Sequence, residues 1–136
     1  MIGHLALGSL IVMINVAIQA ELFAAFGSVL ERIIVQFRRV FRRFANTAAT
    51  VVGVLFVLFV ITIQVWIWSI TFLLVGAIDG LEPAVYFTVV SFTTAGFGDI
   101  TLTHEWRLLS GITAANGFIS FGWSTAYMVE LVRRTA

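Results

Sequence analysis

Three long apolar stretches alternate with polar connections along the chain, over residues 1–30, 47–77 and 105–132. The first two contain few charged side chains, whereas glycine, serine and threonine interrupt the third. An α-helix rises about 1.5 Å per residue, so each stretch is long enough to cross a hydrocarbon core of roughly 30 Å. The pattern predicts three transmembrane helices.

The first stretch lies near the N-terminus, where a cleaved signal peptide is the alternative to a retained helix. A signal peptide begins with a positively charged segment, but no Lys or Arg precedes Arg32, so we expect a retained helix. Asn15 and Gln19 share one helix face with Gly8 and Phe26. Because polar side chains in membrane helices usually face other helices, this face is predicted to pack on the bundle.

Residues 31–44 are amphipathic rather than uniformly apolar. Apolar side chains recur every three or four positions, and the opposite face carries Arg38, Arg39, Arg42 and Arg43. The pattern predicts a helix in the inner membrane interface, with its arginines on anionic lipid headgroups. The arginines come in pairs outside an apolar span, which argues against a voltage sensor.

The second span carries a predicted cap and a predicted aromatic belt. Asn46 or Thr47 suits the N-cap position. Trp66 and Trp68 lie near its outer end, where tryptophans often form an interfacial belt. We expect both tryptophans to belong to such a belt.

A short apolar segment with a glycine-rich continuation follows a turn at residues 79–83. Pro83 suits the first position of a helix, and residues 83–93 span only about 15–17 Å as a helix, too little to cross a membrane. Residues 94–99 are glycine-rich. Irregular backbone at membrane depth is tolerated only where protein or water covers it, so the pattern predicts a re-entrant loop.

Composition places the chain in lipid and limits its chemistry. Of its 136 residues 60% are hydrophobic and 11% charged, against about 45–50% and about 25% in soluble domains. Cysteine and lysine are absent, which excludes thiolate chemistry and a phosphate-binding GxxxxGK[ST] loop. No His, Asp and Glu cluster has metal-ligand spacing. We expect no enzymatic activity, no organic cofactor and no nucleic-acid partner.

The charged residues predict an orientation. Five arginines lie within residues 31–43 and two follow the last apolar stretch. The charged residues of the segment 79–107 are instead mostly acidic. Since basic residues favour the cytoplasmic side, the 31–43 connection and the C-terminus are predicted to be cytoplasmic and the N-terminus outside. We expect a multi-pass protein of the plasma (inner) membrane.

Residues 93–99 read TTAGFGD. Gly96 and Gly98 adopt positive φ readily, unlike their neighbours. A backbone that alternates in handedness turns successive carbonyls to one side, and such a ladder of oxygens can replace the hydration shell of a cation. The stretch resembles the TVGYG filter of potassium channels, with Ala95 in place of the valine and Phe97 in place of the tyrosine. Taken alone, the motif is also compatible with a glycine-rich surface turn.

The last apolar stretch carries a second resemblance to the same family. GFISFG at residues 117–122 is similar to the glycine-hinged inner helix, with Gly117 at the hinge position. Residues 31–134 together resemble the pore module of the potassium-channel superfamily. The helix over 1–30 has no counterpart in its minimal two-helix members. The implied pore domain covers residues 45–134, with an outer helix over 47–77, a pore helix over 83–93, a filter over 94–99 and an inner helix over 105–132.

The resemblance implies an all-α membrane channel that assembles as a homotetramer, since a ring of carbonyls needs several copies of one loop. It implies K⁺ sites made by the backbone carbonyls of Thr94, Ala95, Gly96 and Phe97, in a filter that includes Gly98. Filter support falls to Thr93, Tyr86, Val90 and Asp99, with an expected hydrogen bond between Asp99 and Tyr86. The cavity below is expected to be lined by Phe118, Phe121 and Thr125.

We expect a passive, K⁺-conducting channel, with two alternatives open. One is a channel of weak Na⁺/K⁺ selectivity, because Ala95 leaves space that valine would fill and Phe97 lacks the anchoring tyrosine hydroxyl. The other is a non-conducting or regulatory membrane subunit that keeps the pore fold. A potassium transporter is disfavoured, because it carries four pore loops in one chain and this chain has one.

Overall fold

The computed structural model describes the backbone of residues 2–38 and 42–135 and the side chains of residues 2–29, 32 and 47–133. The described chain is built from helices and their connections. In order, they are α1 (Ile2–Arg38), α2 (Arg42–Leu74), α3 (Leu81–Phe92) and α4 (Arg107–Thr135). The predicted all-α fold is confirmed.

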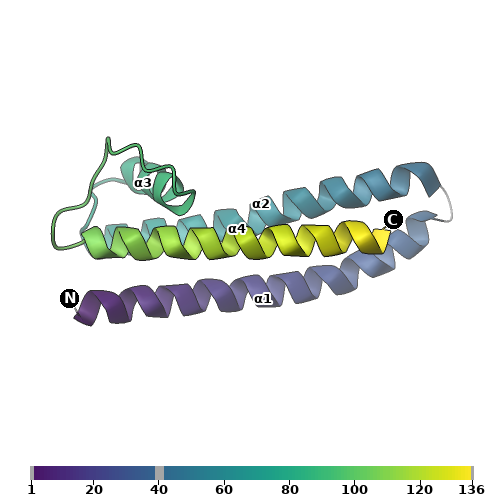
Figure 1. Cartoon of the computed structure of the whole chain (residues 1–136), viewed down its shortest axis with the longest axis horizontal. Coiled ribbons are helices and arrows are strands. Elements are labelled where there is room, and N and C mark those ends of the chain that lie inside the picture. Colours follow the sequence, from purple (N-terminus) through teal and green to yellow (C-terminus); the bar gives the residue numbers. More distant parts are fainter. Residues whose placement is uncertain (1, 39–41, 136) are drawn as a thin grey trace.

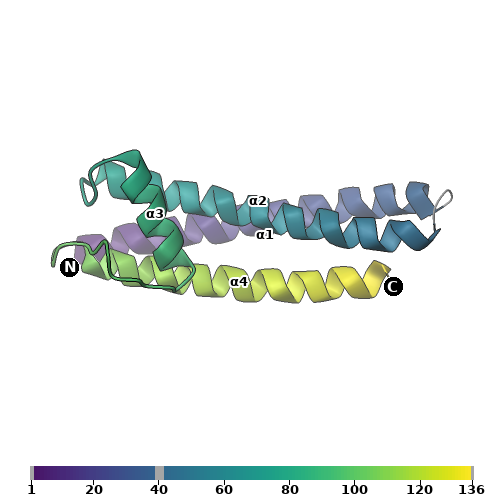
Figure 2. The ribbon, with the colours of Figure 1, turned by 90° about the horizontal axis from the view of Figure 1, so that it is seen from above.

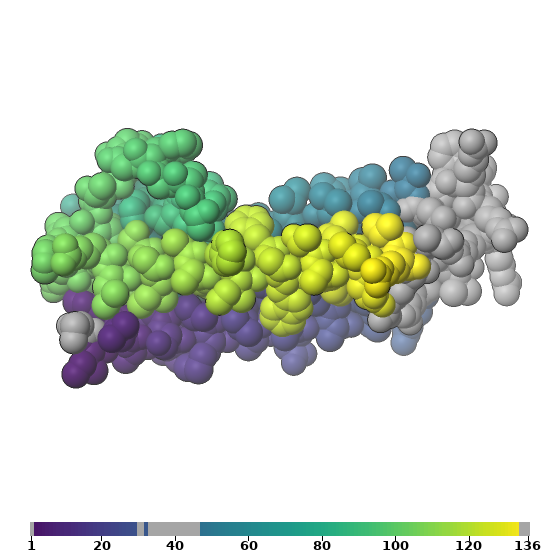
Figure 3. Space-filling view, viewed as in Figure 1, coloured from purple at the N-terminus to yellow at the C-terminus, as the bar shows by residue number. Residues whose placement is uncertain are grey.

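The three long helices lie side by side, and α2 runs antiparallel to α1 and α4 (Figure 1). The short helix α3 packs across α2 and α4 near the end of the bundle that holds the N-terminus, as the turned view also shows (Figure 2). From the end of α3 the chain returns to that same end before α4 begins. In the space-filling view α3 and this loop stand out from the bundle (Figure 3).

The distribution of polar and apolar side chains is that of a membrane protein. Ile2–Val29 of α1 and Thr47–Leu74 of α2 are each long and apolar enough to span a membrane. Large apolar side chains are exposed on them: Met13 by 61%, Leu55 by 59% and Phe59 by 56%. Polar side chains such as Asn15 and Asn116 are instead buried between the helices. This arrangement suits a hydrocarbon solvent, in which exposed polar groups would go unsatisfied.

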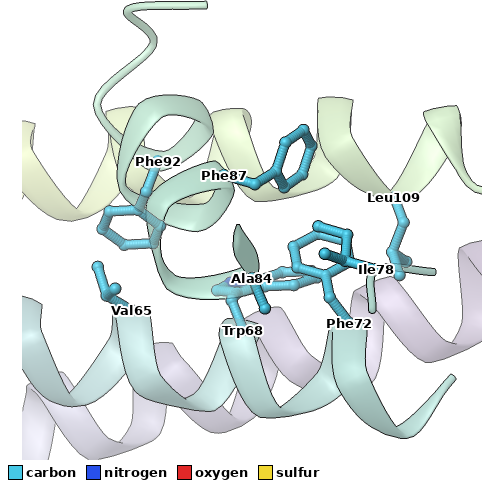
Figure 4. Close-up of a cluster of buried hydrophobic side chains, with 8 residues drawn as sticks. All are labelled: Val65, Trp68, Phe72, Ile78, Ala84, Phe87, Phe92 and Leu109. Carbon is cyan, nitrogen blue, oxygen red and sulfur yellow. The ribbon is translucent and has the colours of Figure 1, made fainter. Parts of the chain in front are cut away.

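An apolar cluster fixes α3 on the bundle (Figure 4). The Phe72 and Phe87 rings meet edge to face, with centroids 5.2 Å apart, and Phe92 is fully buried. Aromatic rings in such contacts add stabilisation beyond the area they bury. The buried members of the cluster are Val65, Trp68, Phe72, Ile78, Ala84, Phe87, Phe92 and Leu109.

A second cluster joins the long helices farther from α3. Phe26 stacks on Phe56 with centroids 3.9 Å apart, and Phe23 stacks on Tyr127 at 4.2 Å. Gly8 of α1 is buried against Ile112 of α4. The predicted packing of the face that carries Gly8, Asn15, Gln19 and Phe26 onto the bundle is therefore confirmed.

The separate interfacial helix predicted over 31–44 is wrong for the described residues. Residues 31–38 continue α1, and α2 already begins at Arg42, so Asn46 and Thr47 lie inside α2 rather than capping it. Arg39 and the side chains of Arg38, Arg42 and Arg43 lie outside the described residues. The change from apolar to amphipathic sequence marks a change of surroundings, and a helix can cross such a change without a break.

Two further expectations need correction. Trp68 is not in an exposed belt: it is fully buried, and its indole N–H donates to Asn116 Oδ1 at 2.9 Å, whereas Trp66 is 43% exposed. Helix α3 begins at Leu81 after the N-cap Gly80, so Pro83 is the third helical residue rather than the first. Proline is tolerated there, because the first N–H groups of a helix have no intrahelical partner.

Candidate functional site

The loop after α3 is tied to the last turn of that helix. The carbonyl of Val90 accepts from the N–H groups of Ala95 at 3.0 Å and Gly96 at 3.3 Å. The N–H of Thr94 donates to Ser91 O at 2.9 Å, and the Thr93 hydroxyl donates to Val89 O at 2.7 Å. Carbonyls left free at the end of a helix are thereby used to turn the chain back.

Backbone handedness alternates along this loop. Thr94, Gly96 and Gly98 have φ values of 60°, 57° and 78°, whereas Ala95 and Phe97 between them keep negative φ. The predicted positive φ of Gly96 and Gly98 is confirmed. The positive φ of Thr94 is an addition, and in a non-glycine residue it costs about 1–2 kcal/mol. Such strain is characteristic of sites whose geometry is needed for function.

The loop is uncovered on the single chain. Residues 93–99 are all exposed, and the Phe97 side chain is exposed by 73%. A Cβ placed on Gly96 or Gly98 would meet no atom within 4 Å. The glycines are therefore required for their backbone conformation and not for packing within the chain.

The predicted hydrogen bond between Tyr86 and Asp99 is present. The Tyr86 hydroxyl donates to Asp99 Oδ2 at 2.6 Å, which joins α3 to the far end of the loop. This hydrogen bond, foremost among several causes, lowers the pKa of Asp99 and raises the pKa of Tyr86. The contact is strongest while Asp99 is ionised and Tyr86 keeps its proton.

Acid is expected to release this contact. Since the pKa of Asp99 lies below its ordinary value, the contribution is complete above about pH 4 and is lost as pH falls through the lowered pKa. The raised pKa of Tyr86 preserves the contact beyond about pH 10. The loop should thus loosen only in strong acid. The protection factors of the loop amides, which are the intrinsic exchange rate divided by the observed rate at each pH, measure this from pH 2 to pH 8. Tyr86→Phe should remove the fall of these protection factors in acid.

On α4, Gly117 lies directly beneath the end of α3. A Cβ on Gly117 would come within 1.8 Å of the Phe92 carbonyl oxygen, and α4 continues as a helix through this position. Phe118 is exposed by 74%, and Thr125 is exposed nearly two turns further along. Phe121 is partly buried, with its ring centroid 6.0 Å from that of Phe92.

Sequence reasoning missed the partners of Asn15 and Gln19. They are Gln64 on α2 and Asn116, Ser120 and Ser124 on α4. Trp68 joins the same group through its hydrogen bond to Asn116. The signal was present as polar side chains at intervals of four within membrane-length helices, which places them on one face.

Among the side chains that the structure describes, no group of three or more His, Asp or Glu could bind a metal ion. A short helix that ends in a loop of alternating handedness, set between two long helices of the bundle, defines the pore module of an ion channel.

The family comparison agrees with this class. The family model described as "Ion channel" matches residues 60–134, more than half of the chain. The chain belongs to this family and carries an ion channel pore module of the potassium-channel superfamily. Family membership points to ion transport across a membrane rather than to enzymatic catalysis. No curated protein and no solved structure gives a significant match.

Proposed function

We propose that four copies of the chain assemble around residues 94–98 and conduct K⁺ passively across the plasma membrane. The carbonyls of Thr94, Ala95, Gly96 and Phe97 form stacked ion sites, and Gly98 ends the filter. The alternation of φ at Thr94, Gly96 and Gly98 carries the proposal, because it permits successive carbonyls to face one axis. Family membership supports ion conduction.

The exposed positions of the single chain support the assembly. One loop supplies one set of carbonyls, so a closed ring requires several chains. The loop is exposed on the same chain as Phe118 and Thr125 of α4. In the assembly these two side chains line the cavity with Phe121, and the partly negative C-terminal end of α3 favours a cation there.

Support for the filter comes from the residues that hold the loop on α3. Val90 contributes its carbonyl, Thr93 its hydroxyl, and Tyr86 and Asp99 their side-chain hydrogen bond. The N-terminus and the filter face the outside and the C-terminus faces the cytoplasm, because basic residues favour the cytoplasmic side. Anionic lipid headgroups bind the arginines at 38, 39, 42 and 43.

Weak selectivity between Na⁺ and K⁺ is the second candidate, and Ala95 is the residue that favours it. Its methyl group fills less space behind the filter than the valine of the family motif. The absence of two methyl groups lowers the packing contribution to the stability of the filter by on the order of 1 kcal/mol or more per chain. A looser ring of oxygens discriminates less between cations of different radius.

Ala95→Val is therefore expected to raise the K⁺/Na⁺ permeability ratio or to increase the order of the filter backbone. The ratio is measured from reversal potentials, and the order from hydrogen exchange of the loop amides. Ala115→Val, at an exposed position of α4, is the matched control for the added volume. Unchanged permeation and unchanged exchange in Ala95→Val would show that alanine does not limit selectivity.

Ion flux from liposomes tests the function itself. Purified protein in vesicles loaded with K⁺ should dissipate the gradient when an ionophore allows protons to exchange. Larger K⁺ than Na⁺ flux supports the proposal, and equal fluxes leave a cation channel without K⁺ selectivity. No flux at any pH or voltage would contradict conduction and favour a non-conducting subunit.

A further inference from the structure

A cluster of buried polar side chains connects α1, α2 and α4 partway along the bundle. Each of its side chains is exposed by no more than 3%. We call this set the polar cluster: Asn15, Gln19, Gln64, Trp68, Asn116, Ser120 and Ser124. Among the described residues, Asn15 Oδ1 is the one buried side-chain oxygen or nitrogen without a hydrogen-bond partner.

Helix α1 holds α4 through side-chain amides. Asn15 Nδ2 donates to Asn116 Oδ1 at 2.8 Å. One turn further, Gln19 Nε2 donates to the carbonyl of Ser120 and to the hydroxyl of Ser124, at 3.2 Å each. The contacts to α4 thus extend over two turns and reach both sides of position 117.

Helix α2 completes the polar cluster from the other side. Gln64 Nε2 donates to Gln19 Oε1 at 2.9 Å, and Gln64 Oε1 accepts from the Ser120 hydroxyl at 2.7 Å. Trp68 Nε1 donates to Asn116 Oδ1 at 2.9 Å. Asn116 and Ser120 of α4 are therefore each bound by α1 and α2 at once.

The face of α4 at Gly117 is occupied as well. Because Gly117 has no side chain, the Phe92 carbonyl at the end of α3 can lie against it. Farther along, the Tyr127 hydroxyl donates to Phe23 O at 3.3 Å, and Leu131 packs into the space left by Gly53. Contacts to α1 and α2 accompany α4 for nearly four turns beyond Gly117.

A bend of α4 at Gly117 would break these contacts together. It would draw Ser120 and Ser124 away from the amides of Gln19 and Gln64. The amide groups would then lack partners in a buried, water-poor environment, which is strongly unfavourable. The glycine at 117 is explained by close approach of α3, so it does not by itself imply a flexible hinge.

We propose that α1 is a brace, and that Asn15 and Gln19 are positioning residues that keep α4 straight through Gly117. Control of conduction then lies in the loop after α3 and not in bending of α4. Helix α1 precedes the matched residues 60–134, so the brace is an addition to the pore module. The consequence for conduction rests on the proposed function, whereas the straightness of α4 does not.

Distances measured by pulsed electron paramagnetic resonance test the brace in the full-length protein. The chain has no cysteine, so spin labels attach only at introduced cysteines. Val51→Cys with Ala126→Cys reports on α2 and α4 beyond Gly117, and Leu74→Cys with Leu108→Cys reports on the α3 end. All four positions are exposed. Dilution with unlabelled protein isolates distances within one chain.

In the labelled protein with an intact polar cluster, the distance between the labels at positions 51 and 126 should have one narrow distribution in K⁺, in Na⁺, at pH 4 and at pH 8. Gln19→Leu should at least double the width of this distribution and leave the Leu74–Leu108 distance unchanged. Ser124→Ala removes one hydrogen bond with little change in volume and should broaden the same distribution to a smaller extent. Because Ser124 is a partner of Gln19, this variant keeps the test available if Gln19→Leu does not fold.

Thr62→Val is the matched control, because the Thr62 hydroxyl is exposed and donates only to Leu58 O of its own helix. It should leave both distances unchanged. A Val51–Ala126 distance that shifts between conditions with the polar cluster intact would overturn the brace. Unchanged widths in both Gln19→Leu and Ser124→Ala would overturn it too.

Ion flux in the same samples separates the two proposals. Absent flux with a narrow, fixed distance contradicts conduction and leaves the straight α4 standing. Flux together with a shifting distance contradicts the brace alone.

Discussion

Gly117→Ala is expected to destabilise the folded chain by about 3 kcal/mol or more, at the upper end of overpacking effects. The added Cβ would lie 1.8 Å from the Phe92 carbonyl oxygen. Backbone atoms on both sides must then move, because no flexible side chain can give way. The midpoint of unfolding in sodium dodecyl sulfate, followed by circular dichroism, measures the loss.

Two glycines of the same helix provide matched controls for this prediction. A Cβ on Gly111 or Gly122 would meet nothing within 4 Å of the chain. Gly111→Ala and Gly122→Ala should leave the stability unchanged or raise it by up to about 1 kcal/mol, since alanine favours helix. If Gly117→Ala behaves like these controls, close approach to Phe92 is not the reason for the glycine.

Gly96→Ala is expected to abolish K⁺ flux. Its φ of 57° is unfavourable for alanine by about 1–2 kcal/mol per chain, or about 4–8 kcal/mol for four copies in one assembly. The loop would relieve this strain by rotating the peptide, and a carbonyl would then leave the axis. Flux from K⁺-loaded liposomes measures the effect.

Gly76→Ala is the control that distinguishes an altered filter geometry from general backbone strain as the cause of lost flux. Gly76 has a similar φ of 68° and open space at its Cβ position, but it lies in the connection after α2. This variant should carry the same backbone cost and retain flux. Equal loss of flux in both variants, or flux retained in Gly96→Ala, would argue against carbonyl ion sites in the loop.

The sequence predicted the long helices because lipid imposes simple requirements, and two of the three predicted spans, in α1 and α2, are long and apolar enough to cross a membrane. Long apolar stretches and the face of Asn15 and Gln19 follow from the absence of water partners in a bilayer. The positive φ of Gly96 and Gly98 followed from the conformational freedom of glycine. The contact between Tyr86 and Asp99 came from the family resemblance.

Features that depend on tertiary contacts were missed. Trp68 looks like a belt residue until Asn116 is known to face it from α4. The close approach of the end of α3 to Gly117 was missed, because no sequence pattern shows which backbone faces that glycine. The extension of α1 to Arg38 was missed because side-chain pattern reports the surroundings of a helix better than its ends.

The reversal potential of purified protein in a planar bilayer, with K⁺ on one side and Na⁺ on the other, tests the central claim most directly. A conducting TTAGFGD filter that prefers K⁺ predicts a current that reverses well away from zero, toward the equilibrium potential of K⁺. A conductance that reverses at zero, or no conductance at all, would contradict a K⁺-selective pore.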